Sequence, residues 1–286
     1  MKHLVLGASG QLGHDLLEAF RERYPAEEVV PATHQQIEIS DENAVRKLLG
    51  DVRPDVVINT AAYSQVDACE DDPNLAFSLN AVAPLYLARA SESIGATLVQ
   101  FSSDYVFDGA KRVPYTEQDA AKPISLYGMS RLAGENIVQL YSSKALVIRT
   151  CGLYGVAGRH SKGGNFVETM LRLAGSGKPL SVVNDQVVTP TSTRELAQRL
   201  IPLILEKRYG LFHMTNAGSC TWFEFAQEIF RISGLDPKLS PVTSAEFGAR
   251  ARRPAFSVLE NAALRNAGHQ EFGPWQQALA QYISQR

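Results

Sequence analysis

The first half of the chain alternates between short continuous apolar runs and longer segments with apolar residues at helical spacing. Continuous runs of this length are typical of strands that are buried on both faces of a parallel sheet. The predicted strands are 2–6, 29–32, 55–59, 97–102 and 146–150, and the predicted helices are 11–23, 40–49, 75–94 and 127–141. This alternation predicts an α/β fold with a Rossmann-type doubly wound parallel sheet.

Two residues should shape these helices. Ser40 is the predicted N-cap of the helix that follows it, with Asn43 in place of the usual glutamate. Pro84 falls inside the predicted helix 75–94. It should kink or segment that helix, because proline lacks a backbone donor and clashes with the preceding turn.

The regular alternation weakens after Thr150. The predicted loops are 152–164, 184–193 and 246–254, and the predicted helices are 165–173 and 222–232. We divide the chain into a Rossmann core at 1–150 and a smaller C-terminal substrate-binding lobe at 151–286, interleaved with the core. The helically spaced residues Trp222, Phe223, Phe225, Ile229 and Phe230 are interpreted as core of this lobe, and a ligand platform is the alternative.

Composition narrows the class of protein. The chain has 286 residues, 45% hydrophobic and 20% charged, with a net charge of −2 that gives no basic surface for nucleic acid. Nothing resembles a signal peptide or the ~20 apolar residues of a membrane span, so we expect a cytoplasmic protein. Cys69, Cys151 and Cys220 follow no disulfide or metal pattern, and the six histidines include no i,i+4 pair. We therefore predict reduced core thiols and no metal site.

A glycine-rich turn follows the first predicted strand. Gly7, Gly10 and Gly13 have the spacing GxxGxxG and lead into the first helix. A pyrophosphate at a helix N-terminus needs free backbone N–H groups and no Cβ in the way. The turn, including Gln11 and Leu12, is therefore the predicted cofactor-binding loop, and a plain strand–helix turn is the alternative.

The end of the second strand normally decides between NAD(H) and NADP(H). A carboxylate there binds the ribose 2′-hydroxyl and repels a 2′-phosphate. Here the strand ends at Ala32-Thr33-His34, with no acid and no arginine. The missing carboxylate favours NADP(H), although NAD(H) stays open, and Glu38 is expected near the adenine.

Hydroxyl groups follow the fourth strand and open the next helix. Ser103 lies at a strand end, where ligands bind in open α/β sheets. Tyr127 and Arg131 are four residues apart and share one helix face. A phenol near a fixed cation ionises more readily and can exchange the proton that a hydride reductase requires. The alternative is that Arg131 is an ordinary surface residue.

Several motifs together resemble the extended short-chain dehydrogenases, and most closely the dTDP-4-dehydrorhamnose reductase family. They are Gly7–Gly13, Asn59-Thr-Ala-Ala-Tyr63, Asn80, Ser102-Ser-Asp-Tyr-Val-Phe107, Tyr127-Gly-x-Ser-x-Leu-Ala-Gly-Glu135, Asn165-Phe166, Asp185-Gln186 with Pro190-Thr191, and Arg253-Pro254 before Ser257. The resemblance covers almost the whole chain. It implies an NAD(P)H-dependent reductase of a nucleotide-linked sugar.

The resemblance also implies roles for individual residues. Tyr127 would donate the proton, Ser103 would hydrogen-bond the substrate carbonyl, and Arg131 would support both the tyrosine and the cofactor. The residues expected to line the cofactor are Ala61, Ala62 and Tyr63, and those expected to contact the substrate are Ser103, Asp104 and Arg253. We interpret Arg253, with Arg250 and Arg252, as a diphosphate clamp, and a solvated charge run is the alternative.

Two positions depart from the family pattern. Arg131 stands where the family has lysine, which keeps the charge but changes the shape of the group. Gly152 stands where the rhamnose enzymes usually have tryptophan, so the sugar pocket should differ. These departures leave two alternatives open: a reductase of another nucleotide sugar, and a non-catalytic dinucleotide-binding subunit similar to the methionine adenosyltransferase β-subunit. A homodimer also stays open.

Overall fold

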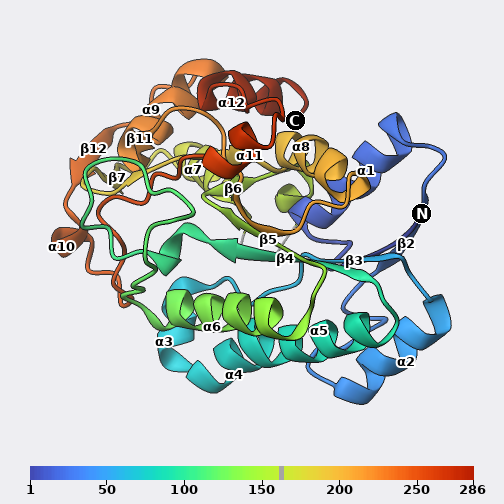
Figure 1. Cartoon of the computed structure of the whole chain (residues 1–286). Helices are drawn as coiled ribbons and strands as arrows, with labels where there is room; N and C mark the ends of the chain where they lie inside the picture. Colours follow the sequence, from blue (N-terminus) through green and yellow to red (C-terminus); the bar gives the residue numbers. More distant parts are fainter. Residues whose placement is uncertain (161–163) are drawn as a thin grey trace.

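The computed structural model of the chain describes residues 1–160 and 164–286. At its centre lies a six-stranded sheet with the strand order β10-β5-β4-β3-β1-β2, in which every pair is parallel (Figure 1). Its strands are β1 (Lys2–Leu6), β2 (Glu28–Ala32), β3 (Val56–Asn59), β4 (Thr97–Ser103), β5 (Ala145–Thr150) and β10 (Gly210–His213). The strand order reverses between β1 and β3, the point at which sheets of this kind bind ligands.

Helices cover both faces of the sheet, as Figure 1 shows. One face packs against α1 (Gln11–Arg23) and α8 (Thr193–Leu205), and the other against α2 (Glu42–Val52), α5 (Ala83–Ser93) and α6 (Leu126–Tyr141). Strand β4 is buried along its whole length, with Val99 in the first layer and Leu98 in the second. The prediction of a doubly wound parallel sheet is confirmed.

The predicted helix 75–94 is divided into segments. After α3 (Val66–Asp71), the chain forms α4 (Pro73–Phe77), a π-helical turn η1 (Ser78–Val82) and α5. Pro84 lies in the first turn of α5, directly after the π-helical turn, where the hydrogen-bond pattern of the helix changes. The expected segmentation at this proline is confirmed.

Some local predictions are wrong. The N-cap of α2 is Asp41 rather than Ser40, because the Asp41 carboxylate accepts hydrogen bonds from the backbone N–H groups of Asn43 and Ala44. Segment 152–164 is not all loop, since it contains β6 (Leu153–Tyr154) and a 3₁₀ turn η3 (Val156–His160), while 161–163 lie outside the described residues.

The other two predicted loops also contain regular structure. Segment 184–193 holds β8 (Val187–Val188) and β9 (Thr191–Ser192) and runs into α8, and segment 246–254 begins inside α10 (Ser244–Phe247). Strand β6 pairs with β9 and β8 with β11 (Cys220–Thr221). These two-residue strands exist only through partners distant in sequence, which local patterns do not reveal.

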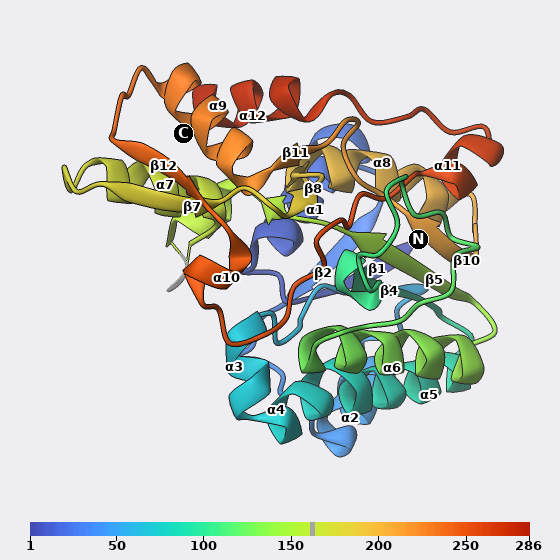
Figure 2. The same cartoon turned by 90° about the vertical axis from the view of Figure 1, so that its left-hand side faces the viewer.

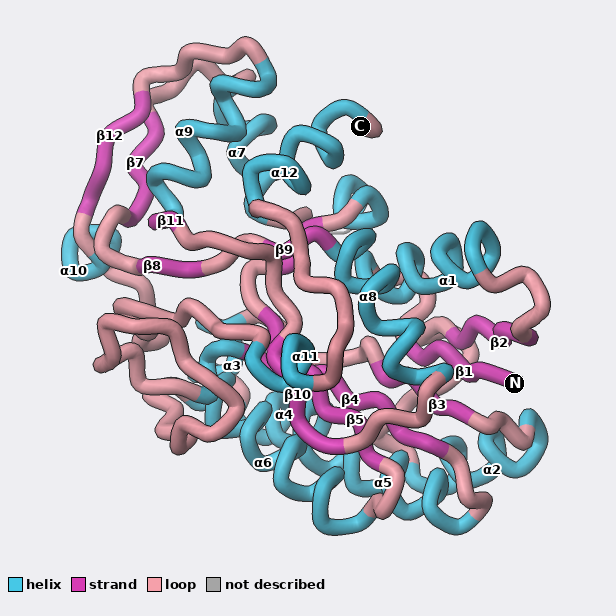
Figure 3. Tube along the Cα trace, turned by 45° about the horizontal axis from the view of Figure 1, so that its top comes forward, coloured by secondary structure: helices cyan, strands magenta, loops and turns pink. Residues whose placement is uncertain are grey.

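The smaller lobe packs around its own apolar cluster. It is built from α7 (Phe166–Ala174), β7 (Leu180–Val183), α9 (Trp222–Ser233), β12 (Leu239–Val242) and α12 (Trp275–Ser284). Figure 2 shows this lobe to one side of the sheet, and Figure 3 shows β7 beside β12 at its outer end. Phe225, Ile229 and Phe230 are buried in the cluster, which confirms them as core, whereas Trp222 and Phe223 are half-buried at its edge.

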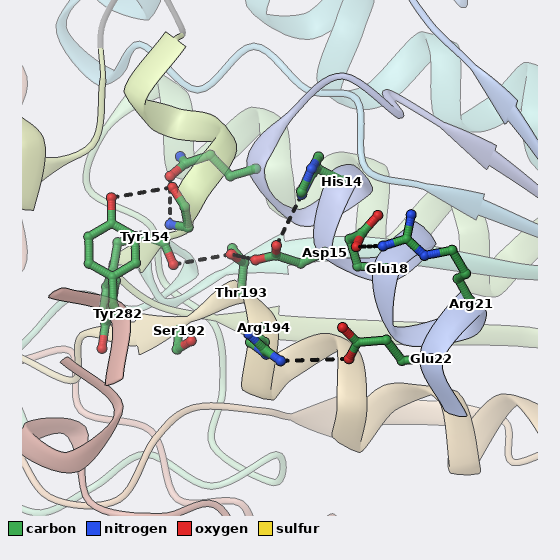
Figure 4. A network of polar contacts seen from close by, with 12 residues as sticks. His14, Asp15, Glu18, Arg21, Glu22, Tyr154, Ser192, Thr193, Arg194 and Tyr282 are labelled. Carbon is green, nitrogen blue, oxygen red and sulfur yellow. Dashed lines mark hydrogen bonds and ion pairs between the residues drawn. The ribbon is translucent and has the colours of Figure 1, made fainter. Parts of the chain in front are cut away.

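Core and lobe are joined by both chain path and polar contacts. Strand β10 and helix α8 come from the second half of the chain but belong to the central layers, and α11 (Ala262–Asn266) packs beside β10. The Thr193 hydroxyl on α8 lies between the Asp15 carboxylate on α1 and the Tyr154 backbone oxygen of β6 (Figure 4). His14 also contacts Asp15, at 3.3 Å. This network fastens the lobe to the helix that follows the glycine turn.

Candidate active site

The glycine turn lies at the carboxyl edge of the sheet, between β1 and α1. Gly7 has a φ of +76°, and its N–H donates to the Ala32 oxygen of β2 at 2.9 Å. A Cβ at Gly13 would lie 2.8 Å from Ala8 Cα and closer still to the Gly7 oxygen. Within residues 1–160 and 164–286, no side chain caps the start of α1. The turn therefore leaves backbone N–H groups for an anion, as a bound pyrophosphate requires.

Gln11 and Leu12 can take part in this loop only through their backbone. The Gln11 side-chain oxygen accepts hydrogen bonds from Gly155 N and Asn165 Nδ2, both at 2.9 Å. The Leu12 side chain is buried in the core beneath α1. These side-chain contacts stabilise the fold. The predicted cofactor contacts of Gln11 and Leu12 would therefore be made by their backbone N–H groups.

The loop after β3 lies directly beside the glycine turn. A Cβ at Gly7 would come within 2.9 Å of Ala61 N, which shows how closely the two backbones approach. Ala62 is exposed, and Ala61 and Tyr63 are half-buried. The structure thus brings the predicted cofactor residues Ala61, Ala62 and Tyr63 to the same edge as Gly7.

Tyr127 and Ser103 meet where α6 crosses the end of β4. Both side chains are buried, and the Ser103 hydroxyl is one of the groups that act on the pKa of the Tyr127 phenol. Burial raises the pKa of Tyr127, whereas the Arg131 charge and the Ser103 hydrogen bond act to lower it. The expectation of easier ionisation is therefore wrong for the net effect, because burial outweighs the cation. The phenol stays protonated at neutral pH, the state in which it can donate a proton.

Arg131 is a buried residue, so its interpretation as an ordinary surface arginine is wrong. Its side chain is 6% exposed, and its guanidinium carbon lies 6.0 Å from the centre of the Tyr127 ring. Its Nη2 donates to the Phe101 backbone oxygen at 2.5 Å, and its Nη1 donates to Asn80 Oδ1 at 3.4 Å. Two fixed acceptors thus hold the positive charge beneath the tyrosine.

Asp104 is turned into the protein. Its carboxylate accepts hydrogen bonds from Ser103 Oγ at 2.9 Å and from Cys151 Sγ at 3.0 Å, and it also bonds to Ser257. Burial raises the pKa of Asp104, and these hydrogen bonds oppose the rise. The sequence predicted that Asp104 contacts the substrate. In the structure its carboxylate instead contacts the Ser103 hydroxyl and orients it.

Arg253 reaches the same region from the loop after α10. Its guanidinium makes a two-pronged ion pair with Asp67 on α3, at 3.0 and 2.9 Å, and it also hydrogen-bonds Tyr105. Arg250 pairs with Asp71, and Arg252 is exposed. The three arginines therefore have separate surroundings, and of the three only Arg253 is linked to a tyrosine, Tyr105.

The position that departs from the family pattern, Gly152, lies at the end of β5. It has a φ of +54°, and a Cβ there would lie 3.2 Å from Pro190 Cα and 3.4 Å from Trp222 Cη2. The aromatic ring of Trp222 therefore borders the backbone at Gly152. This ring comes from α9 and not from position 152 itself.

Sequence reasoning missed several residues that shape the site. Asn80 carried no predicted role, and Cys151 and Ser257 were not linked to Asp104. Cys151 directly follows strand β5 at the carboxyl edge, a position that could have marked it. Asn80 and Ser257 come from distant segments, so only the fold reveals their contacts.

Neither a metal site nor a membrane span is found in the described residues. No group of three or more His, Cys, Asp or Glu within them is arranged to hold a metal ion. None of their helices is long and apolar enough to cross a membrane.

Beyond β2, the His34 ring approaches Glu38 at 3.6 Å, and Glu38 also accepts hydrogen bonds from Ser40.

The residues at this edge of the sheet define a class of protein. It is a hydride reductase that holds its nicotinamide cofactor on the glycine turn. Sequence comparison is more specific: the chain belongs to the RmlD substrate binding domain family, whose model matches residues 1–286.

Three similar proteins represent this family. The probable dTDP-4,6-dihydroxy-2-methyloxan-3-one 4-ketoreductase of Streptomyces antibioticus is 40% identical, over 98% of this chain and 93% of its own length. The crystal structure of a dTDP-4-dehydrorhamnose reductase from Clostridium acetobutylicum is 43% identical, with a TM-score of 0.94 over 100% of this chain and 99% of that one. The Bacillus anthracis dTDP-4-dehydrorhamnose reductase, solved in complex with NADP, is 36% identical with a TM-score of 0.94, at the same coverages.

Proposed function

We propose that the protein uses NAD(P)H to reduce the C4 ketone of a nucleotide-linked 6-deoxy-hexose. The proposed substrate is dTDP-4-dehydro-L-rhamnose, and the product is dTDP-L-rhamnose. The observation that carries this proposal is the placement of Tyr127, Ser103 and the buried Arg131 charge at the same sheet edge as the glycine turn. The names of the similar proteins support the choice of substrate.

The glycines shape the turn that would receive the cofactor. A Cβ at Gly7 or Gly13 would press on neighbouring backbone, so the absence of side chains at both positions keeps the turn tight. The Gly10 N–H donates to the Gly7 oxygen at 2.9 Å, so the backbone N–H groups of Gln11 and Leu12 would hold the pyrophosphate beside Gly10, and Ala61–Tyr63 would line the nicotinamide half. The bound nicotinamide supplies the hydride.

The residues of this chain would handle the proton and the carbonyl. When the ketone binds, the Ser103 hydroxyl would turn its single proton from Asp104 to the ketone oxygen and so align that oxygen with Tyr127. As hydride adds to C4, the Tyr127 phenol would give its proton to the ketone oxygen and then regain one from solvent. Arg131 would stabilise the transient phenolate, because its charge lies beneath the ring.

The environment of Tyr127 suits the reductive half of the reaction at neutral pH. Because burial raises the pKa of Tyr127, the protonated phenol that ketone reduction needs is the main form at neutral pH. Oxidation of the product alcohol would need the phenolate, so it should accelerate only as the pH rises towards the raised pKa.

A coupled assay tests the proposed function. The ketosugar would be generated from dTDP-glucose with a dehydratase and an epimerase, and loss of NADPH and of NADH would be followed separately. We expect oxidation that depends on both the epimerase and this protein, with NADPH preferred. The Tyr127→Phe variant should bind cofactor but lose at least about 10²-fold in turnover, the usual contribution of a proton donor.

Other outcomes would identify the alternatives. Turnover of a different ketosugar would link the departure from the family pattern at Gly152 to another substrate. Cofactor binding with no ketosugar turnover, together with capture of a stable partner, would favour a non-catalytic subunit. Unchanged turnover by Tyr127→Phe would remove the tyrosine from the mechanism.

The proposal extends to organisation and location. We assign 1–150 to the cofactor core and 151–286 mainly to the sugar-nucleotide lobe, with Ser103 and Arg253 facing the substrate and the buried Asp104 acting through Ser103. We also propose a homodimer, which the exposed apolar side chains Met129, Leu140 and Tyr141 on α6 favour and which light scattering would test. A cytoplasmic location agrees with the free thiols of the three buried cysteines.

A further inference from the structure

The buried carboxyl group of Asp104 carries a second donor that the proposed reaction does not use. Asp104 is 2% exposed, and the Ser103 hydroxyl donates to its Oδ1 at 2.9 Å. The Cys151 thiol donates to its other oxygen, Oδ2, at 3.0 Å. The hydroxyl and the thiol therefore share one carboxylate, each on its own oxygen.

Strand pairing explains why the thiol lies there. Strands β4 and β5 are parallel, and Ser103 pairs with Thr150, so the next residue of each strand, Asp104 and Cys151, are neighbours at the carboxyl edge. Cys151 is 2% exposed. Burial and the Asp104 charge raise the pKa of the Cys151 thiol, so it keeps its proton and remains a donor.

The Ser103 hydroxyl has one proton and must give it to different acceptors in turn. Asp104 holds this proton in the free protein, and the ketone oxygen would take it when substrate binds. The carboxylate then loses the donor on Oδ1, which is costly for a buried charge. A thiol that stays on Oδ2 keeps part of that charge satisfied and makes the turn of Ser103 easier.

We propose that Cys151 is a positioning residue, whose thiol holds the Asp104 carboxylate so that Ser103 can turn its hydroxyl to the ketone. Without the thiol, the carboxylate would depend more on Ser103 and would keep the proton of that hydroxyl more tightly. This role rests on the proposed carbonyl-binding function of Ser103.

A matched control exists elsewhere in the chain. Cys220 is also a buried thiol, at 4% exposure, but it lies in the apolar cluster of the smaller lobe. Cys220→Ala removes the same atoms as Cys151→Ala and therefore reports the effect of losing a buried thiol. Cys151→Ser is the conservative variant, because its hydroxyl can still donate to Asp104.

The first measurement is steady-state reduction of the ketosugar. We expect Cys151→Ala to lower kcat about ten-fold, a usual effect of losing one hydrogen bond to a charged group, with the NADPH Kd changed by less than about two-fold. Cys151→Ser should recover to within about three-fold of the unmodified protein, and Cys220→Ala should stay within about two-fold.

A double-mutant cycle tests whether Cys151 acts through Ser103. The Ser103→Ala variant has no hydroxyl for the carboxylate to retain. Adding Cys151→Ala to it should therefore cost less than about two-fold in single-turnover rate, in place of the ten-fold loss expected for Cys151→Ala alone. A ten-fold loss in both backgrounds would mean that the thiol acts independently of Ser103 and would overturn the proposal.

The second measurement requires no turnover. The S–H stretching band of Cys151 is read by Raman spectroscopy as the difference between each protein and its own Cys151→Ser partner. Ser103→Ala should move this band to lower frequency, because the carboxylate charge is then shared by fewer donors and the thiol bond strengthens. Asp104→Asn should move it to higher frequency, because a neutral amide is the weaker acceptor.

The outcomes separate this role from simple packing and from the proposed function. A band that stays in place in both variants, or a Cys151→Ala protein that keeps full kcat, would overturn the proposal. Band shifts of the expected sign in a protein that reduces no ketosugar would support the shared carboxylate and contradict the proposed function.

Discussion

Gly13→Ala probes the part of the site that the whole account depends on. Gly13 lies in the first turn of α1, and an added Cβ would press on Ala8 Cα at 2.8 Å and on the Gly7 oxygen. Both are backbone atoms of the glycine turn, so the turn itself must shift. Elsewhere in a helix the same change is favourable by about 1 kcal/mol, because alanine is the better helix former.

The size of the effect follows from these contacts. Overpacking of this kind costs about 1–3 kcal/mol, which corresponds to a fall in Tm of roughly 2–8 °C for a chain of this size. Cofactor at about 100 times its Kd should stabilise the unmodified protein by about 2.7 kcal/mol. The variant should lose most of that stabilisation, since the displaced turn no longer presents its N–H groups.

The assay is thermal unfolding with and without NADPH. Gly50→Ala is the matched control: Gly50 lies inside α2, and no atom of the described residues comes within 4 Å of a Cβ placed there. It should raise the Tm and keep the full response to cofactor. A Gly13→Ala protein with the control's stability and an undiminished cofactor response would refute the assignment of the glycine turn.

Two further predictions concern the layer that supports α6. The buried Glu135–Arg149 ion pair joins α6 to β5, and breaking it with Arg149→Ala should cost about 3–5 kcal/mol in urea unfolding; a loss below 1 kcal/mol would contradict this. His213 should make the fold acid-sensitive, because burial and the Arg149 charge lower its pKa to about 3. The unfolded chain takes up a proton at His213 below its pKa of about 6.5, whereas the folded protein does not until the pH nears 3. The free energy of unfolding should therefore fall by about 2 kcal/mol between pH 7 and pH 5. His213→Gln should lack that portion of the drop, and an equal drop in the variant would exclude the histidine as its source.

The core could be predicted because its determinants are local. The ranges predicted for β1 and α1 match the structure, since a buried apolar run and a helical stripe are each read within a few residues. The short strands β6, β8 and β9 and the sheet strand β10 were not predicted. Their pairing partners lie far along the chain, and local sequence carries little information about them.

The candidate site divides in the same way. The positions of Tyr127, Ser103 and the glycine turn follow from strand ends and helix spacing. The partners of the charged groups do not: Arg253 meets Asp67 on α3, and Asp104 turns towards Cys151. The net pKa shift of Tyr127 also depends on burial, which only the packed structure supplies.

Transfer of deuterium from NADPH in which both nicotinamide C4 hydrogens are deuterium tests the central claim most directly. The labelled cofactor would be incubated with the enzymatically prepared ketosugar and this protein, and the sugar product examined by NMR and mass spectrometry. The account predicts one deuterium at C4 of the sugar, incorporated at least about 10²-fold more slowly by the Tyr127→Phe protein. Label at another carbon, or oxidised cofactor with no label in the sugar, would contradict it.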